Sequence, residues 1–183
     1  KNAHLSIKEL DYLVFGRGPG SFTGVRVGVG VAQGLAFGAE LKVVPISNLT
    51  TMAEQAYQEL GTTEVIALID ARMNEVYFSQ LIRTENGWME KVKEQVCSPE
   101  RALEQFQLDD KKITVVGTGW AAYSQFAEQN LPLVISEITL PSAKYMLALA
   151  EQEIEKGNVK SVDEIEPVYL RNEVTWKKLP HKQ

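Results

Sequence analysis

Short apolar runs alternate with helix-like patterns over the first sixty residues. The run "YLVF" is apolar, stops at a glycine and is typical of a buried strand. A glycine-rich loop follows, and Ser21 or Thr23 is expected to cap a helix that reaches about Phe37, with Gly38 at its C-terminal end. Another strand and another helix come next, the latter capped by Ser47. These predicted elements occupy 12–15, 23–37, 41–47 and 48–60.

The pattern changes after Gly61. Three strand-like runs come first, and then helices and strands alternate, with Ser98 as a predicted N-cap and Pro99 in the first helical position. The predicted order is βββαβαβα, at 64–70, 75–83, 88–96, from 98, 113–119, 120–129, 131–136 and 141–156. The βαβα order of the first part resembles the back half of this unit. The sequence therefore predicts two similar α/β lobes, the first truncated at its front.

Composition narrows the class of protein. The chain has 183 residues, 44% of them hydrophobic and 23% charged, which is usual for a globular domain. Its net charge of −5 argues against a nucleic-acid-binding protein that works alone. With one cysteine no internal disulfide forms, so we expect a reducing, cytoplasmic setting. The sequence has no apolar run near the ~20 residues that cross a membrane. Its first residue is Lys rather than Met, and we expect a front segment to be missing.

Eight glycines lie between residues 15 and 38, and known phosphate motifs do not explain them. The segment lacks the lysine of a Walker A loop and the spacing of a dinucleotide fingerprint, and the residues around Ser21 do not form a nucleophile elbow. Each glycine inside a helix costs about 1 kcal/mol relative to alanine. On a helical wheel Gly30, Gly34 and Gly38 stack, with Gly24 and Gly28 beside them. This smooth face packs either against the sheet of its own lobe or against another subunit.

Two further stretches carry candidate chemistry. "DARMNEVY" places Asp70, Arg72 and Glu75 around a tight turn, either as a charged hairpin turn or as a nucleotide or metal contact in an interlobe cleft. "VGTGW" is a strand-to-helix turn whose backbone N–H groups could hold an anion; it contains Gly117, Thr118 and Gly119.

The cysteine, the histidines and the basic tail give little evidence of a functional site. Cys97 is expected to be a buried or half-buried thiol. The two histidines, His4 and His181, have no spacing typical of a zinc peptidase. The run Trp176–Lys178 is expected to be a solvated tail.

Several strings together resemble one family. "GRGPGSFTGVRVGVGVAQGLAFGAEL", "DARMNEVYF", "VGTGW" and "EPVYLRN" are similar to those of the bacterial TsaB (YeaZ) family, and the resemblance covers essentially the whole chain. It implies an α/β, duplicated actin-like (ASKHA) fold with two lobes, the first lacking its N-terminal hairpin and helix. The expected lobes are 1–60 and 61–165, and the tail 166–183 is expected to return to the first lobe.

The resemblance also implies a function. TsaB is the non-catalytic paralogue and partner of TsaD, which makes threonylcarbamoyladenosine in tRNA, and TsaE joins them. We expect a homodimer in isolation, tRNA contact only through the complex, no intrinsic cofactor or metal, and any nucleotide at the interface with partners. The expected partner interface is Gly24, Val27, Gly28, Gly30, Val31, Gly34, Leu35 and Gly38, and the possible nucleotide cleft is Asp70, Arg72, Gly117, Thr118 and Gly119. The alternatives are a peptidase-like or actin-like ATPase enzyme, and a homodimeric interaction protein without a tRNA role.

Overall fold

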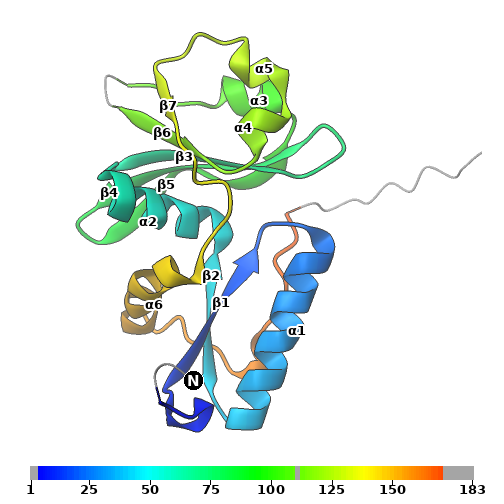
Figure 1. Cartoon of the computed structure of the whole chain (residues 1–183), viewed down its shortest axis with the longest axis vertical. Helices are drawn as coiled ribbons and strands as arrows, with labels where there is room; N and C mark the ends of the chain where they lie inside the picture. The colour runs from blue at the N-terminus through cyan, green and yellow to red at the C-terminus, as the bar shows by residue number, and fades with distance from the viewer. Residues whose placement is uncertain (1–3, 110–111, 171–183) are drawn as a thin grey trace, which may run out of the picture.

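The protein is built around two β-sheets. A computed structural model describes residues 4–109 and 112–170 (Figure 1). The smaller sheet pairs β1 (Tyr12–Gly18) with β2 (Lys42–Ser47) in parallel. The larger has the strand order β5-β4-β3-β6-β7. Its strands are β3 (Glu64–Asp70), β4 (Val76–Thr84), β5 (Gly87–Cys97), β6 (Ile113–Val116) and β7 (Leu133–Ile135).

Two helices cover the two faces of the small sheet. Helix α1 (Phe22–Ala39) connects β1 to β2 and buries Val29, Ala32 and Ala36 against them. Helix α6 (Met146–Glu155) packs on the opposite face through a cluster with β2. Figure 1 shows α1 on one side of β1 and β2 and α6 on the other. Because these apolar faces leave water on folding, the small sheet is held between two helices.

The large sheet is also covered on both faces. Helix α2 (Asn48–Leu60) buries one face, and three short helices cover the other. The short helices are α3 (Pro99–Glu104), α4 (Gly119–Ala122) and α5 (Ser124–Ala127), and the 3-10 turns are η1 (Ile7–Glu9), η2 (Ala143–Tyr145) and η3 (Val162–Glu164). In the described residues, no helix has both the length and the apolar character that spanning a bilayer requires.

The three predicted N-cap positions are confirmed. Ser21 caps α1, Ser47 caps α2 and Ser98 caps α3, each through its side-chain oxygen, and Pro99 occupies the first turn of α3. Of the two candidates for the first cap, Ser21 is therefore the residue used.

Three helix bounds differ from the prediction. Helix α1 continues past Gly38, and Glu40 adopts the left-handed C-cap conformation with φ 57°. The helix expected at 120–129 is two short pieces, because Tyr123 is extended between them. The helix expected at 141–156 begins with the 3-10 turn η2.

Two helices pack differently from what a division of the chain at Gly61 would give. Helix α2 belongs to the expected lobe 1–60, yet its buried face lies on the large sheet. Helix α6 belongs to the expected lobe 61–165, yet it lies on the small sheet (Figure 1). The division of the chain into two separate lobes stays a prediction. The structure adds that each expected lobe contributes one helix to the sheet of the other.

The chain returns to the small sheet after α6. The backbone N–H of Val168 donates to the Arg17 carbonyl at 3.2 Å, and Lys160 bridges to Val43 of β2. The predicted tail continues to 183, but 171–183 lie outside the described residues.

Candidate functional site

Helix α1 has one buried face and one open face. The buried face consists of Val29, Ala32 and Ala36, which lie in one cluster with Phe15 and Val43 of the small sheet. The interpretation that the glycines pack against their own sheet is therefore wrong. The glycines face away from the sheet because valine and alanine side chains already fill the space between α1 and the sheet.

All eight residues of the expected partner interface are exposed. Val27 is 59%, Val31 55% and Leu35 45% exposed, which is unusual for aliphatic side chains in the middle of a helix. A Cβ atom added to Gly28, Gly30, Gly34 or Gly38 would have no neighbour within 4 Å. Gly24 differs, because its added Cβ would lie 2.6 Å from the Oγ of the cap residue Ser21. The open face is thus apolar, flat and without a partner among the described residues; we call it the α1 face.

The loop before α1 is fixed to the start of α2. The side-chain amide of Asn48 donates to the Pro19 carbonyl at 3.0 Å, and a Cβ on Gly16 would lie 2.3 Å from the Asn48 Oδ1. The Ser21 hydroxyl accepts the N–H of Gly24 at 3.1 Å. These contacts account for Gly16 by its close approach to Asn48 and for Ser21 by helix capping.

The Asp70 turn brings together residues from two distant stretches. Asp70 ends β3, and its backbone N–H donates to the hydroxyl of Thr118, 48 positions further on, at 3.1 Å. The Asp70 carboxylate accepts from the Arg72 N–H at 2.9 Å and from the Tyr123 hydroxyl at 2.7 Å, and it pairs with the Arg72 guanidinium at 3.1 Å. The predicted neighbourhood of Asp70, Arg72 and Thr118 is therefore present, but Arg72 and Tyr123 already occupy the carboxylate.

The same contacts shift two pKa values in opposite directions. Burial favours a neutral Asp70, but the hydrogen bonds from Tyr123 and Arg72 and the Arg72 charge outweigh it, so the pKa of Asp70 is lowered. Burial and the bond to Asp70 raise the pKa of Tyr123 to about 12. Both groups are thus held in their ordinary forms at neutral pH, with Asp70 ionised and Tyr123 protonated.

Gly117 and Gly119 are explained by packing against β3. A Cβ on Gly117 would lie 2.1 Å from the Leu68 carbonyl oxygen, and one on Gly119 would lie 2.9 Å from the Leu68 Cβ. Gly117 also has a φ of 95°, which favours glycine. A role for these residues in binding a nucleotide stays a prediction.

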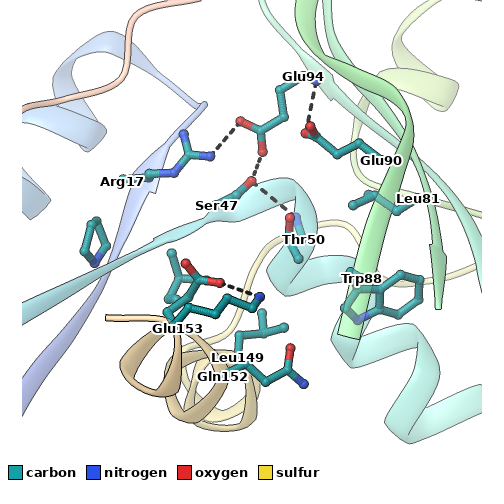
Figure 2. Close-up of a pocket in the computed structure, with 13 residues that line it drawn as sticks. Arg17, Ser47, Thr50, Leu81, Trp88, Glu90, Glu94, Leu149, Gln152 and Glu153 are labelled. Atoms are coloured by element: carbon teal, nitrogen blue, oxygen red, sulfur yellow. Dashed lines mark hydrogen bonds and ion pairs between the residues drawn. The ribbon is translucent and has the colours of Figure 1, made fainter. Parts of the chain in front are cut away.

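A polar pocket of about 330 Å³ lies between the two sheets (Figure 2). Arg17 of β1, Ser47 at the end of β2 and Glu94 of β5 meet at its edge. Glu94 accepts from the Arg17 guanidinium at 3.0 Å and also from the Ser47 hydroxyl. Helix α6 contributes Gln152 and Glu153 to the wall. The Glu94 carboxylate thus joins the large sheet to the small one.

The remaining candidates behave as structural groups. Cys97 is buried, as expected, and burial raises the pKa of its thiol to about 11, partly offset by Arg101. Among residues 4–109 and 112–170, no group of three His, Cys, Asp or Glu side chains could hold a metal ion. His181 and the Trp176–Lys178 run lie outside this part of the chain.

Two long-range side-chain contacts were not predicted from the sequence. Glu94 joins Arg17 across 77 positions, and Arg26 joins Tyr169 across 143 positions. The strings that contain Arg17, Arg26 and Tyr169 were singled out as motifs, but a motif does not state which of its side chains meet.

Comparisons with known proteins define the class of this fold. A model of the TsaD family, tRNA N6-adenosine threonylcarbamoyltransferase, matches residues 1–179. The structure of YeaZ from Pseudomonas aeruginosa superposes with a TM-score of 0.82 at 35% identity, over 92% of this chain and 79% of that one. Another P. aeruginosa structure, described as similar to the peptidase YeaZ, gives a TM-score of 0.84 at 36% identity over 93% and 78%. The chain therefore has the two-lobed, actin-like (ASKHA) α/β fold of the TsaD type.

Curated relatives identify the family within this class. The tRNA threonylcarbamoyladenosine biosynthesis protein TsaB of Haemophilus influenzae is 57% identical over 190 residues, covering 100% of this chain and 79% of that protein. TsaB of Escherichia coli is 48% identical over 180 residues, covering 97% and 78%. The chain belongs to the TsaB (YeaZ) family, as its motifs indicated.

Proposed function

We propose that this protein is a non-catalytic subunit that dimerises with a TsaD-type threonylcarbamoyltransferase and supports threonylcarbamoyladenosine formation at A37 of tRNA. The observation that carries the proposal is the α1 face. Three exposed aliphatic side chains and four glycines without neighbours form a surface that another helix could approach closely. A monomer gains nothing from glycine at these positions, because each one weakens the helix.

The family match supports a partner of the same fold. The TsaD family model covers residues 1–179, so a TsaD-type protein should present a helix equivalent to α1. Two proteins with the same fold can pair through equivalent faces about a pseudo-twofold axis, as homodimers pair through identical ones. Glycine on the α1 face would allow such helices to lie backbone to backbone.

The contacts of the candidate catalytic groups support a non-catalytic role. Ser21 is used as a helix cap, the Asp70 carboxylate is bound by Arg72 and Tyr123, and Gly117 is required by the β3 backbone. In the proposal any nucleotide binds at the interface with partners, tRNA is contacted only through the complex, TsaE joins it, and the protein works in the cytoplasm.

Binding to the partner tests the proposal. Val31→Glu places a charge in the centre of the α1 face and Gly30→Leu adds bulk, so both should weaken the complex with a TsaD-type protein by at least about 100-fold. Met89→Glu is the matched control, because Met89 is exposed on β5, outside the α1 face. Calorimetry measures the affinity and circular dichroism checks the fold. Unchanged affinity in both α1 variants would show that the proposed interface is wrong.

The same face suits a second copy of the chain, which favours a homodimer in isolation. If the protein were only a homodimeric interaction protein, deleting its gene would leave tRNA modification normal. An enzyme would instead hydrolyse ATP or peptides when pure, and Ser21→Ala or Asp70→Asn would abolish that activity. Light scattering, mass spectrometry of tRNA nucleosides and turnover assays separate the three outcomes.

A further inference from the structure

Arg26 stands out in α1, because it is the only charged residue between Phe22 and Ala39. Its guanidinium carbon lies 3.6 Å from the centre of the Phe22 ring and 5.5 Å from that of Tyr169. Its Nε–H donates to the Tyr169 hydroxyl at 2.7 Å. Two aromatic rings and one hydrogen bond therefore fix the orientation of this arginine. We call Phe22, Arg26 and Tyr169 the Arg26 cluster.

The returning chain holds this cluster against the helix. The side-chain amide of Gln33 donates to the Ile165 carbonyl at 3.2 Å, and the Val168 N–H donates to the Arg17 carbonyl at 3.2 Å. Residues 165–169 thus run along one flank of α1 toward its N-terminal end. Tyr169 arrives beside Phe22, with ring centres 6.1 Å apart.

The guanidinium has unused donors. An arginine carries five N–H groups, and only the Nε–H of Arg26 has a hydrogen-bond partner among the described residues. No ion pair to Arg26 occurs in that part of the chain, whereas Arg17, Arg72 and Arg83 each pair with a carboxylate. Phe22 is 57% and Tyr169 47% exposed, so the cluster borders the open side of the helix. A planar fork of free N–H groups, held by stacking, fits a carboxylate in bidentate geometry.

We propose, resting on the function proposed above, that the Arg26 cluster is a polar anchor at the rim of the α1 face and receives an Asp or Glu side chain of the TsaD-type partner. The C-terminal segment 165–169 is then part of the binding surface, because it orients the arginine. An apolar face with a flat glycine ridge lets a partner helix slide or rotate, and one fixed charge pair at its edge would set the register.

A protein carboxylate fits better than a nucleic-acid phosphate. RNA contacts usually come from a basic patch, but α1 has no other cation, Arg17 is already paired with Glu94, and the chain carries a net charge of −5. A single oriented arginine beside exposed apolar and aromatic side chains is the composition of a protein–protein hot spot.

Affinity of the 183-residue chain for the TsaD-type partner tests this anchor. Arg26→Ala should weaken binding about 10- to 100-fold, the loss expected when a charged hydrogen-bonded pair is broken. Arg26→Lys keeps the charge without the planar fork and should lose less. Arg101→Ala is the matched control, because Arg101 is exposed on α3 over the large sheet. The dissociation constant of the wild type should rise more steeply with salt than that of Arg26→Ala.

The other outcomes each overturn the anchor. If Val31→Glu breaks the complex while Arg26→Ala binds like Arg101→Ala, the anchor is wrong and the proposed function stands. If Val31→Glu also binds normally, both fail. Weaker binding of Arg26→Ala with an unchanged salt dependence would mean a structural role only. Normal partner affinity with weaker tRNA binding by the assembled complex, measured by fluorescence anisotropy, would assign Arg26 to phosphate instead.

Discussion

Gly117 shows at the scale of one residue how a motif glycine serves packing. Its φ is 95°, and an added Cβ would lie 2.1 Å from the Leu68 carbonyl oxygen, inside a buried strand that cannot move aside. Gly117→Ala should therefore lower the free energy of unfolding by at least about 2 kcal/mol, through strain and steric clash together. Urea denaturation measures the loss.

Gly61→Ala is the matched control for this prediction. Gly61 also has a positive φ, 68°, but an added Cβ there would meet nothing within 4 Å. It should cost only the left-handed backbone penalty of about 1–2 kcal/mol. Equal losses in the two variants would mean that the β3 backbone yields easily, and the packing explanation of "VGTGW" would fail.

Helix α1 shows a conflict between stability and contact at the scale of one element. Gly28, Gly30 and Gly34 lie in open space, so alanine at each should stabilise the monomer by up to about 1 kcal/mol. In the proposed complex the three methyl groups would hold the partner helix away, so the triple variant should bind less tightly but melt at a higher temperature when both proteins are measured as monomers. Calorimetric melting and partner titration together measure both effects.

Ala32→Gly is the control that separates the two effects. Ala32 is buried on the sheet side, so losing its methyl group lowers the stability of the fold without changing the α1 face. Its affinity should stay near that of the wild type. If the triple alanine variant also binds normally, no partner approaches the α1 face closely, and the glycines need another explanation.

Sequence patterns predict a helix well where local contacts determine its ends, and poorly where tertiary contacts determine which of its faces is buried. The cap residues follow from serine side chains that accept nearby backbone N–H groups, so Ser47 and Ser98 were predicted correctly. The expectation that α1 ends at Gly38 is wrong, because Glu40 takes the left-handed C-cap conformation. The wheel grouped the glycines correctly but could not state which side faces the sheet, because valine and alanine suit either side.

At the scale of the whole molecule, the α/β order and the two sheets could be predicted from alternation and from family resemblance, but the exchange of helices could not. The amphipathic patterns of α2 and α6 state that each buries one face, and they do not name the sheet that receives it. For the same reason the sequence does not predict the contact of Glu94 with Arg17, 77 positions away, or that of Tyr169 with Arg26, 143 positions away.

The Glu94 contact makes a prediction about how the two sheets hold together. Glu94 lies on β5, its side chain is only 8% exposed, and it accepts from Arg17 and Ser47 of the small sheet (Figure 2). Glu94→Ala leaves a cation and a hydroxyl without their acceptor, so the free energy of unfolding should fall by about 1–3 kcal/mol. Hydrogen exchange should speed up around Ser47 and Arg17 more than in β3, because the interlobe contact loosens before the large sheet opens.

Glu153→Ala is the matched change, since the Glu153 carboxylate lies on the other wall of the same pocket, where it pairs with Lys156 and accepts from Asn158 at the C-terminal end of α6. Exposed pairs of this kind contribute little, so its effect should stay within about 0.5 kcal/mol. If Glu94→Ala is equally mild and exchange is unchanged, apolar packing of α2 and α6 alone holds the sheets together. A large effect confined to Glu94 would instead make this carboxylate the polar link between the lobes. Changes on the α1 face should then leave that link intact.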